Sequence, residues 1–284
     1  MPKRKPPKRV ANKITLQTRE EIAKMTLMNN DFMNLALEDN IPCVEEMLRV
    51  ILEKQDLVVK TARTQKFFQG FKRSVYLDIF AEDSNGVLYN IEIQQADEGA
   101  DPRRARFHTG MIDVHNLKAG QGFKELPECY VIFITLNDVL GMNQTIYTIH
   151  KYIDGSMKPF DDGSHLIYIN GSAKDNGTEV GKLVHDLRCT KADEMFFPRL
   201  AARIKFLKED EKGVKIVSSY FEKLREKAVR EAVIATEKKD AEAHKKEKES
   251  MVLNLINLGK LSLEEIAECS GLTLKKIRML ATTL

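Results

Sequence analysis

The four cysteines of this 284-residue chain lie far apart, and no two of them form a CxxC pair. This scatter excludes a disulfide-dense secreted domain and a cysteine zinc site, and it favours a reducing cytoplasmic location. No apolar run approaches the roughly 18 residues of a membrane-spanning helix, so we expect no membrane partner. The basic start MPKRKPPKRV has no apolar segment behind it, which argues against a secretory signal.

Motifs of several common enzyme classes are also absent. The chain has no GxxxxGK[ST] or GxGxxG loop, so nucleotide-driven chemistry has no support. The six histidines show no HExxH or other paired spacing, and we interpret them as structural or exposed. With 43% hydrophobic and 31% charged residues, the composition is that of a globular protein, and the length suits two domains or one domain with an appendage.

Four segments differ in composition, although the net charge is only +3. Residues 1–13 are basic and contain no acid, which predicts a disordered arm, either a solubilising tail or a phosphate-contacting one. Residues 14–200 alternate between helical and strand-like patterns and predict an α/β domain. Residues 201–250 predict a helical spacer, because the stretch 221–250 is too polar to pack in a core and is expected to be exposed or oligomerising. Residues 251–284 predict a small helical module with Ser262 and Thr273 as N-caps.

Within the α/β domain, the pattern is helical from about residue 14 to residue 54, with Pro42 suited to a first turn. Residues 57–94 are β-branched and aromatic, and they contain the sequence SVYLDIFAEDSNGVLYNIEIQ. A helix fits residues 101–118, and the continuous apolar run 130–136 predicts a strand covered on both faces. Further strands are expected within 146–153 and 165–169, and an amphipathic helix within 194–209.

The turn of the strand pair fixes its register. The sequence from Asp83 to Val87 suits a three-residue loop with Gly86 in the left-handed conformation. Pairing Asp83 with Val87 places Asp78 directly opposite Glu92, with side chains roughly 5 Å apart at Cβ. Asp78, Glu92 and Gln94 would then share one face of the sheet, and Leu77, Ile79, Ile91 and Ile93 would fill the other. A two-residue Asn-Gly turn would instead shift the register by one residue and separate the carboxylates.

Two opposed carboxylates repel each other unless a cation joins them. Asp78, Glu92 and the backbone carbonyl of Ile93 form an all-oxygen set of the kind that suits Mg²⁺ or Mn²⁺. Such an ion lowers the pKa of a bound water and neutralises charge developing on a phosphate. The competing interpretation is a solvent-facing hairpin whose polar face is acidic.

Asp78, followed fourteen positions later by Glu92-Ile93-Gln94, resembles the motif of the PD-(D/E)XK nuclease superfamily. The closest likeness is to the PD-(D/E)XK nuclease family transposases, which are related to recombination-promoting nucleases. The likeness covers roughly residues 14–170. Within this range the segments NNDFMNLAL and RRARFHTGMIDVHNLKAGQGFKELPECYVIFI also resemble the family. The terminal segment GKLSLEEIAECSGLTLKKIRML resembles the tail that many members carry. The resemblance implies a restriction-endonuclease-like core, a mixed sheet flanked by helices, with a helical C-terminal extension.

The resemblance also implies roles for single residues. Asp78 and Glu92 would bind the metal ion, and Gln94 would orient the attacking water. Leu77 replaces the proline of the superfamily name. Gln94 replaces its lysine, as is usual in this branch, and a glutamine can only orient water by hydrogen bonds. Phe107-His108 replaces what is usually a tyrosine pair, which puts the role of those rings in doubt.

Other side chains are candidates with ordinary alternatives. Asp31 fits the resemblance best as an additional metal-site acid, with Glu45 and Glu46 as alternatives, yet each also suits a helix cap or a solvated position. Arg104 and Arg106, which follow Arg103 on the next helix, are candidates for holding the scissile strand, because the planar guanidinium group of arginine can donate two hydrogen bonds to one phosphate. A solvated helix face is the alternative.

The C-terminal module has two interpretations. As a helix-turn-helix it would offer Lys275, Lys276 and Arg278 to DNA. As a self-association module it would make a homo-oligomer through the C-terminal helices, because Leu274, Ile277 and Leu280 need burial.

Two functions follow from these observations. The first is a metal-dependent DNA endonuclease that hydrolyses phosphodiester bonds, associated with mobile elements or recombination. The second is a nuclease-fold DNA-binding or oligomerising regulator that no longer cuts. Retention of both acids argues against the second. A toxin-like or anti-phage setting would use the same chemistry as the first.

Overall fold

The computed structural model describes residues 16–95 and 97–282 of the chain, and the basic arm predicted at residues 1–13 lies outside them. The described residues divide into two compact units that meet after Tyr220. The first unit opens with three helices, α1 (Leu16–Lys24), α2 (Asn30–Leu37) and α3 (Ile41–Leu52), where the sequence predicted a helical region. Asn29 caps α2 by accepting a hydrogen bond from the Phe32 amide at 2.9 Å, and Pro42 lies in the first turn of α3.

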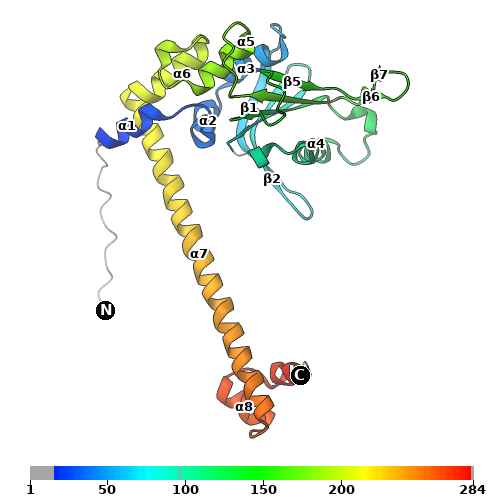
Figure 1. Cartoon of the computed structure of the whole chain (residues 1–284), viewed down its shortest axis with the longest axis vertical. Helices are drawn as coiled ribbons and strands as arrows, with labels where there is room; N and C mark the ends of the chain where they lie inside the picture. Colours follow the sequence, from blue (N-terminus) through cyan, green and yellow to red (C-terminus); the bar gives the residue numbers. More distant parts are fainter. Residues whose placement is uncertain (1–15, 96, 283–284) are drawn as a thin grey trace. The chain divides into compact units, whose positions relative to one another are not determined.

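A mixed six-stranded sheet forms the centre of the first unit (Figure 1). Its strands follow the spatial order β1-β2-β3-β4-β8-β5, with antiparallel pairs at both edges and β3, β4 and β8 parallel to each other. The strands are β1 (Val59–Phe68), β2 (Val75–Asp83), β3 (Leu88–Gln94), β4 (Cys129–Thr135), β5 (Ile146–Ile149) and β8 (Ser164–Asn170). A separate two-stranded ribbon joins β6 (Tyr152–Ile153) to β7 (Lys158–Pro159).

Helices cover both faces of the sheet, as Figure 1 shows. Helix α4 (Pro102–Asn116) packs on β4, β1 and β2. Helix α3 packs on β1, and α5 (Glu179–Arg188) and α6 (Pro198–Glu209) pack on α3. Every residue of β4 is buried, which confirms the predicted strand covered on both faces. This architecture confirms the expected fold class, a mixed sheet flanked by helices with a helical C-terminal region. Short 3₁₀ turns lie at Asp97–Ala100, Phe123–Glu125 and Ala192–Glu194.

The β2–β3 turn has the predicted three-residue loop. The Asp83 amide donates to the Val87 carbonyl at 3.1 Å, and Gly86 has a φ of 81°. Asp83 Oδ1 also accepts hydrogen bonds from the Asn85 and Val87 amides at 2.8 and 3.0 Å. The ladder then pairs Glu82 with Leu88, Phe80 with Asn90 and Ile79 with Ile91, which is the register predicted from the turn.

One prediction about the faces of this hairpin is wrong. Leu77 does not share a face with Ile91 and Ile93, because it packs in the apolar cluster beneath α4 with Leu88, Phe133 and Met111. The physical reason is an irregularity in the neighbouring strand. Gln65, which the β1–β2 register brings opposite Asp78, has a φ of 50°, and the change of face between Leu77 and Ile79 falls beside this left-handed residue.

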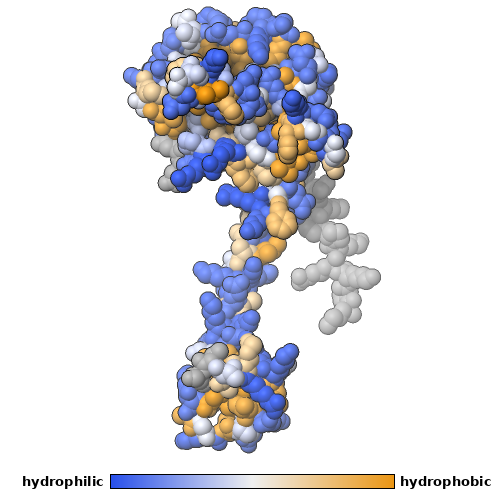
Figure 2. Space-filling model, turned by 90° about the vertical axis from the view of Figure 1, so that its right-hand side faces the viewer, coloured by the Kyte–Doolittle hydropathy of each residue, from blue (hydrophilic) through white to orange (hydrophobic). Residues whose placement is uncertain are grey.

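The second unit consists of helices. Helix α7 (Glu211–Leu258) runs without a break through the residue at which the terminal module was expected to begin. Its side chains are mostly exposed between residues 221 and 250, where Figure 2 shows a hydrophilic surface. The end of α7, with α8 (Leu263–Ser270) and α9 (Leu274–Ala281), buries a small apolar core of Val252, Ile266, Ile277 and Leu280.

The predicted N-caps of this module are present. The Ser262 hydroxyl accepts a hydrogen bond from the Glu265 amide at 3.2 Å, and the Thr273 side chain accepts one from the Lys276 amide. Self-association through these helices stays a prediction. Within the described part of the chain, no helix combines the length and the apolar character that crossing a bilayer requires.

Candidate active site

The two predicted carboxylates lie at the point where β2 and β3 part. The backbone hydrogen bonds between β2 and β3 end at the Ile79–Ile91 pair. Beyond this pair, carboxylate side chains accept the hydrogen bonds of the backbone amides. The Asp78 amide donates to Glu92 Oε1 at 3.1 Å, and the Ile93 amide donates to Asp78 Oδ2 at 3.2 Å. Each acid therefore binds the backbone of the opposite strand, which holds the two carboxylates beside each other at the mouth of the split.

Both carboxylates are withdrawn from solvent, since Asp78 is 6% exposed and Glu92 is fully buried. Burial, and then repulsion from Glu92, raises the pKa of Asp78 to about 6, although hydrogen bonds to its carboxylate oppose the rise. The charged pair is therefore held at an energetic cost in the metal-free protein. A cation between the acids would remove that cost.

Two amide side chains that sequence reasoning missed bind Asp78. Asn30 Nδ2, at the start of α2, and Gln65 Nε2, on β1, donate to Asp78 Oδ1 at 3.2 and 3.1 Å. Gln65 is also the residue with the left-handed backbone, and strained residues of this kind concentrate at functional sites. Nothing in the spacing of the β1 sequence marked Gln65, whereas Asn30 directly precedes the predicted Asp31.

Arg104 of α4, the helix that packs on this face of the sheet, contacts Glu92 and Gln94. Its Nη2 lies 3.3 Å from Glu92 Oε2, and its Nη1 donates to Gln94 Oε1 at 3.1 Å. Gln94 Nε2 in turn lies 3.4 Å from Glu92 Oε2, so the three side chains form a closed triangle. Arg104 is the predicted phosphate contact that the structure brings into the site, and its first partners are Glu92 and Gln94.

His108, one helical turn after Arg104, is the other residue of α4 at the site. Its ring is 1% exposed, and Nδ1 lies 3.4 Å from Glu92 Oε1. Arg104 Nε donates to His108 Nε2 at 3.3 Å, which places the proton of a neutral ring on Nδ1, facing Glu92. The general interpretation of the histidines as structural or exposed did not anticipate this contact.

Asn90 completes the surroundings of His108. Its Nδ2 is placed 3.1 Å from His108 Nδ1, and its buried Oδ1 has no hydrogen-bond partner. A half-turn of the amide would put Oδ1 opposite the Nδ1 proton and satisfy both groups, so we assign that orientation. In this orientation the Nδ1 proton of His108 is shared between Asn90 Oδ1 and Glu92 Oε1.

The structure does not bring the other predicted acids to the hairpin. Asp31 is exposed in the first turn of α2, and its neighbour Asn30 makes the contact with Asp78. Glu45 pairs with Arg49 at 2.9 Å, with Arg199 at 3.2 Å and with the Val59 amide at 3.1 Å. Glu46 accepts a hydrogen bond from the Leu200 amide at 3.1 Å. Glu45 therefore ties α3 to α6 and β1, and Glu46 ties α3 to α6; metal binding by either residue stays a prediction.

The remaining predicted basic residues are exposed or pair with other acids. Arg106 is exposed and lines a separate cavity with Lys151 and Asp162. In the C-terminal module, Lys276 pairs with Glu249 at 2.9 Å and Arg278 with Glu264 at 3.4 Å, while Lys275 is exposed. DNA contact by these three residues stays a prediction.

The donor set at the split strands fits a Mg²⁺-type ion. Asp78 and Glu92 supply carboxylate oxygens, and the Ile93 carbonyl points to the same strand edge as its amide, toward Asp78. No group of three or more His, Cys, Asp or Glu side chains with metal-site geometry occurs among residues 16–95 and 97–282. Two carboxylates are nevertheless enough for Mg²⁺, which keeps several waters and shares substrate phosphate oxygens.

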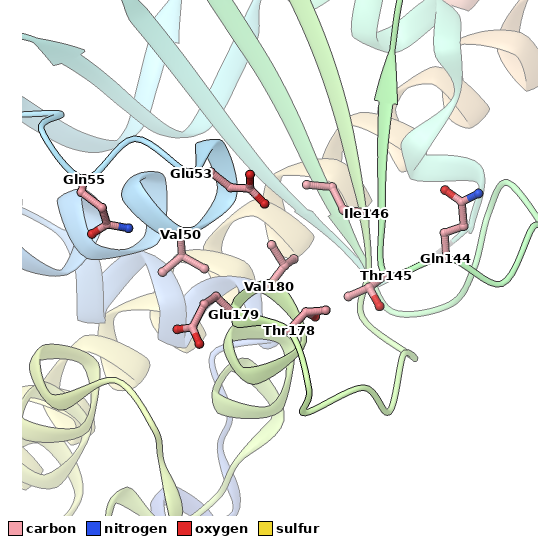
Figure 3. A pocket seen from close by; sticks show the side chains of 9 residues that line it. All are labelled: Val50, Glu53, Gln55, Gln144, Thr145, Ile146, Thr178, Glu179 and Val180. Atoms are coloured by element: carbon pink, nitrogen blue, oxygen red, sulfur yellow. The ribbon is translucent and has the colours of Figure 1, made fainter.

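One concave region of the first unit does not include these acids. It is formed by the end of α3, the start of β5 and the start of α5 (Figure 3). Its lining side chains are Val50, Glu53, Gln55, Gln144, Thr145, Ile146, Thr178, Glu179 and Val180. None of the predicted site residues belongs to it, so this cavity does not bear on the chemistry of the carboxylate pair.

Comparison with known proteins agrees with the geometry. The family model described as PD-(D/E)XK nuclease family transposase matches residues 35–257, well over half of the chain. This range contains the carboxylate pair, Gln94 and the α4 residues around them. No curated protein and no solved structure matches the chain. The chain belongs to the PD-(D/E)XK nuclease family transposases.

Proposed function

We propose that this protein is a metal-dependent DNA endonuclease that hydrolyses phosphodiester bonds in connection with mobile elements or recombination. Membership of the family implies a phosphodiester-hydrolysing nuclease linked to mobile elements, with DNA as its substrate. The observation that carries the finer proposal is the reciprocal bonding of Asp78 and Glu92 to each other's strands where β2 and β3 part. This arrangement gathers two buried acids at one point of the hairpin.

The side chains have separate roles in this proposal. Asp78, Glu92 and the Ile93 carbonyl would hold Mg²⁺ or Mn²⁺, which when bound makes a water more acidic and neutralises charge developing on the phosphate. Gln94 orients the attacking water through its amide, because a glutamine has no titratable proton to exchange. Asn30 and Gln65 fix the Asp78 carboxylate, so that its oxygens are already oriented before substrate binds.

The Arg104 triangle supports the assignment of Gln94. By donating to Gln94 Oε1, Arg104 fixes which end of the amide faces Glu92. A flexible glutamine could present either end to water, and a clamped one presents a defined end. Arg104 is also partly exposed, at 40% of its side chain, and so stays accessible to a phosphate oxygen.

The test is nicking of covalently closed supercoiled plasmid, with Mg²⁺, Mn²⁺ or EDTA. We expect nicking with either metal and none in EDTA. Asp78→Asn should abolish it, whereas Glu82→Gln, which removes a half-buried acid further along the same strand, should leave it unchanged. Nicking that survives Asp78→Asn, or that persists in EDTA, would contradict the proposal. DNA binding without cleavage by any metal would instead identify the non-cutting regulator.

A further inference from the structure

The tip of the β1–β2 hairpin, residues 66–76, carries aromatic side chains that the site does not use. Phe71 is fully exposed in the loop that joins the strands, and Phe67 and Tyr76 are about half exposed. The rings of Phe67 and Tyr76 lie 4.8 Å apart between their centroids, on neighbouring strands. Exposed large aromatics that gather on one element mark an interaction surface more often than a packing defect.

Strand β1 and the tip of the hairpin are also basic and free of acids. Residues 59–77 contain Lys60, Arg63, Lys66, Lys72 and Arg73, and no aspartate or glutamate. Arg63 pairs with Asp39. Lys66, Lys72 and Arg73 are exposed, and none of them forms an ion pair with an acid in the described part of the chain. A basic surface with interleaved aromatic rings is complementary to a nucleic acid, which offers phosphates and flat bases together.

The base of the hairpin is held firmly, so the tip is presented in a fixed place. Phe68 is buried, meets Phe80 edge-on at 5.3 Å and stacks on His115 of α4 at 4.4 Å. His115 Nε2 also contacts the Gln69 carbonyl at 2.9 Å. A preformed surface loses little conformational entropy on binding, which favours contact by the exposed rings.

The backbone at the tip is tightly turned. A β-carbon on Gly70 would lie 1.9 Å from the Arg73 carbonyl oxygen, so only glycine fits there. The Gly70 amide donates to the Ser74 hydroxyl at 3.2 Å and closes the loop. The fully exposed ring of Phe71 is therefore displayed by a defined turn.

The position of the tip relative to the acids favours DNA over another polyanion. Tyr76 precedes Asp78 by two residues on the same strand, about 7 Å along it, and the loop lies further out. Phosphates of one strand are spaced about 3.4 Å apart along a duplex. The tip would therefore meet DNA only a few nucleotides from a phosphate held at Asp78.

We propose that the hairpin tip binds DNA beside the scissile phosphate and selects sites with locally unpaired bases. Phe71 stacks on an exposed base, and Lys72 and Arg73 contact the phosphates that flank it. This proposal rests on the proposed function, because it takes DNA as the substrate. It adds a substrate class, DNA with a gap, bubble or flap next to the cleaved bond.

The experiment measures binding in EDTA, where cleavage does not interfere. Fluorescence anisotropy compares a fully paired duplex with the same duplex carrying a short bubble. The variants are Phe71→Ala and the double variant Lys72→Ala with Arg73→Ala. Phe123→Ala is the matched control, since Phe123 is another strongly exposed phenylalanine followed by an exposed lysine, Lys124, outside the hairpin.

We expect Phe71→Ala to weaken binding to bubble DNA about tenfold and to leave duplex binding within about twofold. The double variant should weaken binding to the duplex and to bubble DNA. The slope of log affinity against log salt concentration should fall by the amount expected for roughly two phosphate contacts. Phe123→Ala should change neither. Because Phe71 is fully exposed, these substitutions should leave the thermal unfolding midpoint unchanged.

Two different failures can be told apart. Wild-type protein that binds and nicks DNA while Phe71→Ala behaves like Phe123→Ala overturns the tip proposal alone. Wild-type protein that neither binds nor nicks DNA overturns the proposed function and the tip proposal together. Loss of binding to anionic lipid vesicles on Phe71→Ala, with unchanged binding to bubble DNA, also overturns the tip proposal and assigns the surface to membranes.

Discussion

Arg104 Nη2 lies 3.3 Å from Glu92 Oε2, and this is the cationic group that the structure places against the buried carboxylate pair. The contact joins α4 to β3 across the site. The protein without metal therefore already carries partial charge compensation at Glu92, supplied by a side chain that is 40% exposed.

Arg104→Ala should destabilise the metal-free protein by about 1–2 kcal/mol, because Glu92 stays buried while a charged donor is lost. The same change should enlarge the stabilisation given by Mg²⁺, since the ion then supplies compensation that the protein lacks. Thermal denaturation in EDTA and in Mg²⁺ measures both effects. Arg106→Ala, which alters an exposed arginine on the same helix, should show neither.

His108→Phe should lower the nicking rate by about 10- to 100-fold. The buried Glu92 Oε1 and the Asn90 amide would lose the donor that orients them, while the ring volume is roughly kept. Single-turnover nicking of supercoiled plasmid checks the rate, and circular dichroism checks the fold. Equal losses in the neighbouring variant Phe107→Leu would indicate a general defect of α4 instead of a role for His108.

The raised pKa of Asp78 predicts a specific pH dependence in EDTA. Between pH 4 and pH 6 the folded state binds more protons at Asp78 than the unfolded state does, so the free energy of unfolding falls as pH rises through this window. The loss should approach roughly 3 kcal/mol above pH 6 and be absent below pH 4. It should disappear from the pH profile of Asp78→Asn.

Urea denaturation at several pH values, compared between wild type and Asp78→Asn, isolates this contribution from the other titrating groups. A difference between the two proteins that stays constant from pH 4 to pH 7 would rule out the raised pKa of Asp78. Addition of Mg²⁺ at pH 7 should raise the unfolding midpoint of the wild type only.

Two glycine substitutions should act in opposite directions. Gly86 has a φ of 81° and open space around its α-carbon, so Gly86→Ala should destabilise the protein by about 1 kcal/mol through backbone strain alone. Gly110 lies exposed within α4 with equally open space, and Gly110→Ala should stabilise it by roughly 0.5–1 kcal/mol. Equal effects at the two sites would show that the turn does not require the left-handed conformation.

The register of the β2–β3 hairpin could be predicted because it depends on local chemistry. Gly86 and the Asp83 side chain define a three-residue loop, and counting outward from that loop pairs the two strands as the structure does. The buried strand β4 could be predicted equally well, because seven consecutive buried residues leave a continuous apolar run in the sequence.

The rest of the site depends on contacts that no local pattern encodes. The left-handed backbone at Gln65 has no glycine or asparagine at that position to predict it, and Leu77 takes the unexpected face beside it. Periodicity located the helix that carries Arg104 and His108 without showing which of its faces packs over Glu92. The orientation of α4 is set by its packing on β4, some 20 or more residues further along the chain.

The parting of β2 and β3 also gives the molecule two built-in reporters. At this point the amides of Asp78 and Ile93 are protected by carboxylates and not by the opposing strand. Any event that withdraws an acid oxygen, such as protonation or occupation by a cation, changes how fast those two amide hydrogens exchange with deuterium. Hydrogen exchange at Asp78 and Ile93 therefore measures the state of the carboxylate pair directly, whether or not a substrate is ever cut.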